Sequence, residues 1–141
     1  MGVEVATHDG ALLAVSWAME GLNEGLAVDW RPDGRIARGD FVATVDMSGH
    51  QDWWPFLGGV VNQVALSWHV PNEGCPEAPW SLRIGMADSS SVVFALGEAK
   101  GGGVLGYQPD AILVIFDEST ARSYRIPASP LSSWGEVIAA V

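Results

Sequence analysis

The stretch WSLRIGMADSSSVVFAL (residues 80–96) decides the fold of this chain of 141 residues. Its first part alternates apolar residues with polar or small ones, and the apolar set is Trp80, Leu82, Ile84 and Met86. A period of two is typical of a β-strand that buries one face. Asp88-Ser89-Ser90 are turn-forming residues, and residues 92–96 are apolar on both faces, as in a strand at the centre of a sheet. The stretch therefore predicts a β-hairpin.

Other strand patterns flank this hairpin. Residues 61–70 alternate between a mainly apolar face and a polar face that carries Ser67 and His69. Residues 112–116 are apolar on both faces, so they also belong near the centre of a sheet. Residues 122–126 alternate again, and we expect them to form an edge strand that pairs with 112–116 through a turn at 117–120.

The chain also contains an internal repeat. The run Ala14-Val15-Ser16-Trp17 reappears as Ala65-Leu66-Ser67-Trp68. Each copy leads through an acidic, turn-rich stretch into an alternating strand, and then into an apolar strand that begins at Ile36 or Val92. The two copies span about residues 12–46 and 63–99. Duplication of a hairpin unit and chance similarity between amphipathic hairpins both explain the pattern.

These patterns predict a single all-β domain over residues 1–141, because many short strands are separated by turn signals. We expect an antiparallel β-sandwich or a small β-barrel with an internal two-fold hairpin repeat. Helix is scarce in the pattern. Ser133 with Glu136 resembles a capping box and predicts a short C-terminal helix over 134–140, and residues 50–57 predict one helical turn that Pro55 interrupts or caps.

Composition and charge narrow the classes of partner. The net charge of −10 comes from 17 acidic against 7 basic residues. A field of this sign repels phosphate backbones and anionic lipids, which disfavours nucleic-acid and membrane binding, and it attracts a basic protein partner. The alternative is that the negative charge only keeps the protein soluble, because the chain contains seven tryptophans and its surface is rich in them.

The single cysteine and the N-terminal residues predict a cytoplasmic protein, and the one glycine motif in the chain gives no support for a cofactor. Cys75 is the only cysteine, so no intrachain disulfide can form. The N-terminus lacks the basic start of a secretory signal, and the longest fully apolar run covers only residues 111–116. Residues 101–106 match G-x-G-x-x-G, but a strand pattern follows instead of the helix that a dinucleotide site needs. We therefore interpret them as a loop.

The sequence contains few candidate catalytic residues. Asp46, His50 and Asp52 lie close in sequence, in the loop after a predicted strand at 41–45, and a carboxylate beside an imidazole can act as a general base. Their spacing matches no metal motif, and loops are ordinarily rich in Asp. His69 would line a pocket if the fold were a barrel and would meet water in a sandwich. We expect a binding protein rather than an enzyme, with no metal.

The segment Trp53-Trp54-Pro55-Phe56 is the most suggestive candidate for a binding surface. Adjacent residues in an extended segment point to opposite sides, so one tryptophan can pack on the core while the other projects. Exposed Trp beside acidic residues is typical of protein interfaces. The alternative is that both tryptophans close the core.

Two functional hypotheses follow. The first is a small acidic, non-catalytic binding module of the immunity or inhibitor type, which acts on a basic partner. It uses Trp53, Trp54, Phe56 and the loop carboxylates Asp46, Asp52, Glu73 and Glu77. The second is a small β-barrel that binds or transforms a hydrophobic small molecule, as a cyclase or isomerase does, with aromatic residues around a cavity. Edge strands would also permit a homodimer.

Overall fold

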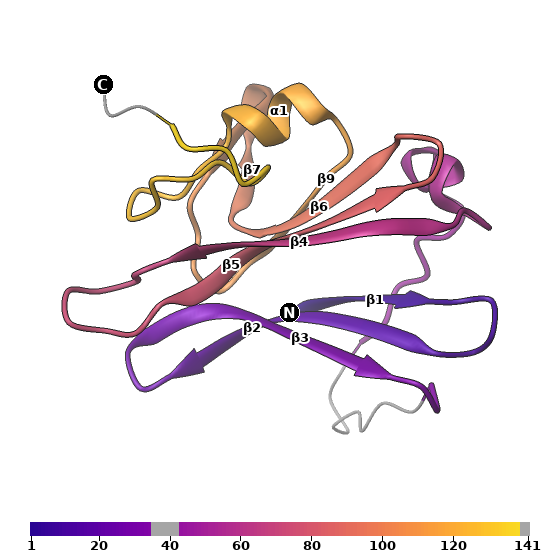
Figure 1. Cartoon of the computed structure of the whole chain (residues 1–141), viewed down its shortest axis with the longest axis horizontal. Helices are drawn as coiled ribbons and strands as arrows, with labels where there is room; N and C mark the ends of the chain where they lie inside the picture. The colour runs from indigo at the N-terminus through magenta and orange to yellow at the C-terminus, as the bar shows by residue number, and fades with distance from the viewer. Residues whose placement is uncertain (35–42, 139–141) are drawn as a thin grey trace.

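The computed structural model describes residues 1–34 and 43–138, and antiparallel strands dominate it (Figure 1). A three-stranded sheet contains, in order, β1 (Gly2–Ala6), β2 (Leu12–Glu20) and β3 (Asn23–Arg31). A four-stranded sheet contains, in order, β4 (Val61–His69), β5 (Ala78–Met86), β6 (Ser91–Leu96) and β9 (Ile112–Ile115). A small hairpin joins β7 (Glu98–Lys100) and β8 (Val104–Gly106) through the 3-10 turn η2 (Gly101–Gly103).

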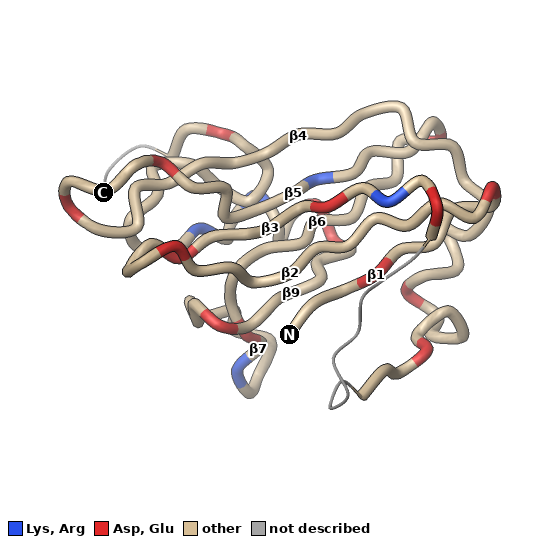
Figure 2. Tube along the Cα trace, turned by 90° about the horizontal axis from the view of Figure 1, so that it is seen from below, with Lys and Arg blue, Asp and Glu red and all other residues tan. Residues whose placement is uncertain are grey.

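The two larger sheets form two layers, which Figures 1 and 2 show from two directions, and their buried side chains form one shared core. Buried side chains of the first sheet, Val15 and Leu26, belong to the same cluster as Trp80, Leu82 and Phe94 of the second. The predicted all-β class is therefore confirmed. Within the part of the chain that the structure describes, the sheets do not close into a barrel, so the architecture is an open sandwich.

The predicted hairpin at residues 80–96 is confirmed. β5 pairs with β6 so that Leu82 lies opposite Phe94. Asp88 organises the turn, because its carboxylate accepts hydrogen bonds from the backbone N–H and the hydroxyl of Ser90, at 3.0 and 2.7 Å. Ser89 takes the positive φ of 73° that this turn needs. The hairpin forms the centre of the four-stranded sheet.

Both copies of the repeat contain an antiparallel hairpin. β2 and β3 are joined by the short turn Gly21-Leu22, whereas β4 and β5 are joined by residues 70–77. The strand predicted to begin at Ile36 falls on residues 35–42, which lie outside the described residues. Of the strand predicted at 41–45, residues 43–45 are described and belong to no strand.

The predicted edge strand at 122–126 is wrong. The α-helix α1 (Glu118–Ser123) begins instead where the sequence predicted a turn. The Asp117 side chain caps it by accepting a hydrogen bond from the Thr120 backbone N–H at 2.7 Å, and Ala121 lies on the buried side of the helix. Capping of the backbone by Asp117 makes a helical turn favourable, although the side chains also alternate in polarity.

The helix predicted over 134–140 is wrong for residues 134–138, and residues 139–140 lie outside the described residues. This segment is a loop closed by an isolated bridge between Leu131 and Val137. The Ser133 hydroxyl, which the capping-box pattern assigned to a helix start, instead donates to the carbonyl of Ala121. A tertiary hydrogen bond has thus replaced the local cap.

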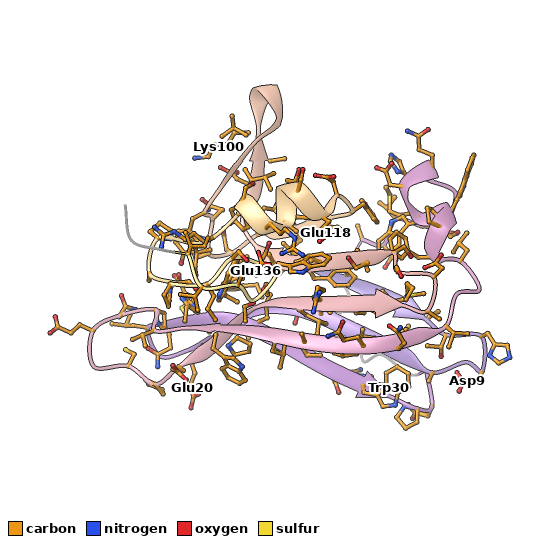
Figure 3. The ribbon with its side chains drawn as sticks, turned by 45° about the horizontal axis from the view of Figure 1, so that its top comes forward. Asp9, Glu20, Trp30, Lys100, Glu118 and Glu136 are labelled. Atoms are coloured by element: carbon orange, nitrogen blue, oxygen red, sulfur yellow. The ribbon has the colours of Figure 1, made fainter. Side chains whose placement is uncertain are left out.

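The C-terminal loop covers the outer face of the four-stranded sheet. A buried serine of β4 holds this loop on the sheet, because the Ser67 hydroxyl donates a hydrogen bond to the carbonyl of Ser132 at 3.2 Å. The Arg122 side chain pairs with both Glu118 and Glu136, which Figure 3 labels close together. Within the described ranges 1–34 and 43–138, no helix is long and apolar enough to cross a membrane.

Candidate functional site

The predicted helical turn exists and carries the aromatic segment. It is the 3-10 helix η1 (Gln51–Phe56), which contains Pro55 and is capped by the His50 ring. Trp53 packs inward, with its ring 4.9 Å from that of Phe116 and 6.3 Å from that of Phe94. Trp54 points away and is 64% exposed. The structure thus separates the two tryptophans, one for the core and one for the surface.

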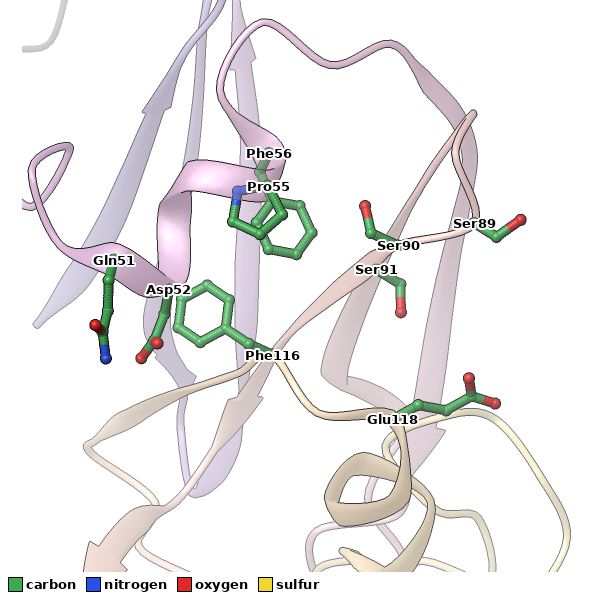
Figure 4. Close-up of a pocket in the computed structure, with 9 residues that line it drawn as sticks. All are labelled: Gln51, Asp52, Pro55, Phe56, Ser89, Ser90, Ser91, Phe116 and Glu118. Atoms are coloured by element: carbon green, nitrogen blue, oxygen red, sulfur yellow. The ribbon is translucent and has the colours of Figure 1, made fainter.

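A cleft of about 340 Å³ lies between η1, the β5–β6 turn and the start of α1 (Figure 4). Its floor consists of Pro55, Phe56 and Phe116, and its rim carries polar side chains: Gln51, Asp52, Ser89, Ser90, Ser91 and Glu118. Two carboxylates beside aromatic rings offer an environment for a cationic side chain, through charge and through contact with the ring faces.

The structure brings two of the three clustered catalytic candidates together. The Nδ1 of His50 accepts a hydrogen bond from the Asp52 backbone N–H at 3.4 Å and lies 3.5 Å from the Asp52 carboxylate. Asp46 caps its own turn by accepting from the Ser48 backbone N–H at 2.9 Å, and this bond lowers the pKa of Asp46. Across the described residues no group of three metal-ligating side chains occurs.

His69 lies in an unexpected environment. The sequence predicted that it meets water in a sandwich, but its side chain is only 2% exposed. Its Nε2 donates to the carbonyl of Glu24 at 3.0 Å, which leaves Nδ1 buried with no hydrogen-bond partner in the described structure. Burial lowers the pKa of His69 because it disfavours the imidazolium form. A buried neutral histidine that bonds to the backbone is a structural group.

This burial predicts a pH-dependent stability. The folded-state pKa of His69 lies below the ordinary value of about 6.5, so the unfolded chain binds more protons in the interval between the two values. The contribution is complete above about pH 6.5 and is lost as the pH falls through that interval. Urea unfolding of the wild type and of His69→Gln should give free energies that converge as the pH falls from 7.5 towards 5.5. Parallel pH profiles would contradict this assignment.

The apolar face of β4 is exposed, although it lies on the inner side of the sheet. Leu66 pairs with Leu82 of the core, so both side chains point towards the other sheet. However, β3 packs over β5, and the side chains of β4 are left open: Leu66 is 40%, Trp68 43% and Val64 61% exposed. We call Val64, Leu66 and Trp68 the β4 open face. Among the strands of residues 1–34 and 43–138, β4 is also the edge strand of its sheet.

The predicted acidic loop residues lie at one end of this strand. Glu73 and Glu77 are both exposed, in the connection between β4 and β5. The Asn72 side chain ties this connection to the β2–β3 turn by donating to the carbonyl of Leu22 at 2.8 Å. Figure 2 shows acidic residues both in the turns and on the strands of the molecule. Glu73 and Glu77 therefore flank the β4 open face and are absent from the cleft beside η1.

Comparisons with known proteins give no further guide, because no protein family, no curated protein and no solved structure matches the chain.

Sequence reasoning missed two parts of these surfaces. Glu118 and Phe116 enter the cleft because α1 turns back beside β9, and nothing local in the sequence indicates this proximity to Asp52. The β4 open face had a visible signal: the segment from Trp53 to Asn72 contains no charged residue in a chain of net charge −10. That signal marks either a core strand or an interface.

Proposed function

We propose that this protein is a non-catalytic binding module for a basic protein, and that the β4 open face is its main contact surface. The observation that carries the proposal is that β4, which pairs on one side only among the described strands, leaves its inner-facing apolar side chains exposed. Contiguous exposed apolar side chains are typical of protein interaction sites. Full burial of a Val or Leu side chain is worth roughly 1.5–3 kcal/mol, so covering this face favours association.

The edge position supports the same proposal. Natural edge strands are usually protected by charges or prolines, and β4 contains neither between Val61 and His69. Irregularities in its pairing with β5, between Val61 and Gln63 and between Ser67 and Trp68, lie towards its two ends and leave the part between them regular. The backbone N–H and carbonyl groups on the side of the central part that no described strand covers can pair with an extended segment of a partner, as in β-strand addition.

Charge supports a basic partner. Glu73 and Glu77 flank the β4 open face, and the net charge of −10 steers a cationic protein towards it. The cleft beside η1 fits a Lys or Arg side chain of that partner, with Asp52 and Glu118 as counter-charges (Figure 4). Exposed Trp54 lies on the same short helix as Asp52. Apolar contact thus supplies affinity, and the carboxylates supply orientation and rate.

Site-specific crosslinking tests this proposal. A photo-crosslinking amino acid placed at Leu66 should capture a basic protein in the native host, whereas the same amino acid at Glu98 on β7 should not. With the captured protein purified, Leu66→Asp should weaken binding by at least about tenfold, which corresponds to about 1.4 kcal/mol. Affinity should also fall with added salt, because the steering charges are exposed.

Val104→Asp is the matched control, since Val104 is an exposed aliphatic residue on β8, in the small hairpin that also carries Glu98. It should bind as the wild type does, and both variants should keep the wild-type melting temperature. Equal crosslinking from both positions, an acidic captured protein, or wild-type affinity of Leu66→Asp would each contradict the proposal.

A further inference from the structure

A second cavity lies between the two sheets, at the end of the sandwich where β1 and β3 approach η1. Its volume is about 530 Å³, within the range of about 300–1,000 Å³ that is usual for small-molecule sites. Its walls come from three separate parts of the fold: Trp30 of β3, Trp53 and Phe56 of η1, and Ile84, Met86 and Phe94 of the central hairpin. It shares Phe56 with the cleft that holds Asp52, but its other lining residues are different.

The lining of this cavity is apolar except at one place. Aliphatic, aromatic and glycine residues form most of it, and the polar side chains come from the turn after β1, at Thr7, His8 and Asp9. Figure 3 labels Asp9 and Trp30 at the same end of the molecule. An apolar cavity with a small number of polar groups on one side holds the body of a ligand by contact and orients its polar end.

The turn after β1 presents a hydrogen-bond acceptor. The Thr7 hydroxyl donates to the Asp9 carboxylate at 2.5 Å, and the Ala11 backbone N–H lies 3.4 Å from the same oxygen. The Thr7 hydrogen bond, followed by that from Ala11, lowers the pKa of Asp9, so this carboxylate is ionised at neutral pH. An ionised carboxylate accepts hydrogen bonds and attracts cations but repels anions.

We propose that this cavity binds a small hydrophobic molecule whose polar end is a cation that donates hydrogen bonds, with the apolar body between Trp30 and Phe94 and the polar end at Asp9. The site needs no closed barrel, because both sheets and η1 contribute walls. It also differs from the proposed protein-binding surface, since Val64, Leu66 and Trp68 do not line it. The proposed protein-binding surface and the proposed small-molecule site can therefore be tested independently.

The site is tested first with Nile red, a neutral dye that fluoresces in apolar surroundings. We expect saturable binding of one dye molecule per chain, with energy transfer from tryptophan. Val60→Trp and Val61→Trp place a large ring at exposed positions that line the cavity, and each should weaken dye binding by at least about tenfold. Val64→Trp is the matched control on the same strand, and it should retain wild-type affinity.

The polar end is tested by competition between decylammonium and decanoate, two ions with the same chain length and opposite charge, below their micelle-forming concentrations. Decylammonium should displace the dye at a lower concentration than decanoate. Asp9→Asn should reduce this difference several-fold more than Glu98→Gln, which changes the net charge equally at an exposed position on β7.

Three outcomes would overturn the inference. The first is absence of saturable dye binding. The second is equal loss of binding in Val64→Trp and Val61→Trp, which would place the dye on the β4 open face. The third is an unchanged preference between the two ions in Asp9→Asn. Circular dichroism of each variant distinguishes lost binding from lost folding, and Val60→Trp, at a more exposed position than Val61, provides the second folded test of the cavity.

Discussion

Gly97→Ala should unfold this protein or destabilise it by more than about 4 kcal/mol, a loss that single substitutions reach only at special sites. Gly97 has a φ of 145°, a backbone conformation that residues with a Cβ rarely adopt. A methyl group there would overlap the hydroxyl of Tyr124, the carbonyl of Gly106 and the side chain of Leu113. These neighbours are packed around the end of β6, so none can move freely. Urea unfolding measures the effect.

A substitution at Tyr124, the nearest neighbour of Gly97, tests whether overlap with the added methyl group causes the loss of stability. Tyr124 is buried and donates its hydroxyl to the carbonyl of Leu96 at 2.5 Å, and burial raises its pKa to about 12. Tyr124→Phe removes the overlapping oxygen, so the double variant with Gly97→Ala should be destabilised by less than the sum of the two single losses. Gly101→Ala, where a Cβ meets nothing within 4 Å, should change stability by less than about 0.5 kcal/mol. Additive losses would contradict the overlap.

Trp80→Ala should cost about 3–5 kcal/mol, the usual range for truncating a buried tryptophan. Trp80 is fully buried on β5, and its ring meets that of Tyr124 edge to face at 5.8 Å. Its removal opens a cavity between the sheets, where both layers are fixed by hydrogen-bonded strands and cannot collapse far. The midpoint and slope of urea unfolding give the loss.

Trp54→Ala is the matched control for this prediction, because it removes the same side chain from an exposed position on η1. It should change the free energy of unfolding by less than about 0.5 kcal/mol. If Trp54→Ala proved as costly as Trp80→Ala, then Trp54 would be part of the core and would leave the proposed binding surface. The comparison therefore also tests which aromatic residues are available to a partner.

Local sequence patterns predicted the central strands well and the C-terminal part of the fold poorly. The hairpin β5–β6 could be predicted because side-chain alternation and turn chemistry agree over residues 80–96. The helix α1 was missed because residues 122–126 also alternate, and the cap from Asp117 outweighs that weak pattern. The C-terminal helix was predicted wrongly because Ser133 bonds to Ala121 instead of to its own segment.

The candidate sites were only partly predictable. Asp52 and Phe56 were expected in a binding surface and do line one cleft. Their neighbour Glu118 comes from a helix far along the chain, and such proximity follows from the path of the sheet rather than from any spacing of residues. The cavity that holds Trp30 depends likewise on how the two layers separate at one end.

The sequence by itself determined that β4 has one apolar and one polar face, because side chains alternate along any extended strand. Only the tertiary structure decided which face is covered. The C-terminal loop accepts a hydrogen bond from buried Ser67, and Glu24 at the start of β3 accepts one from buried His69. The strand β3 otherwise packs over β5 and leaves Leu66 open. Hydrophobicity describes how strongly a side chain favours burial, but burial itself requires a partner surface, and the position of that surface is set by the packing of distant segments.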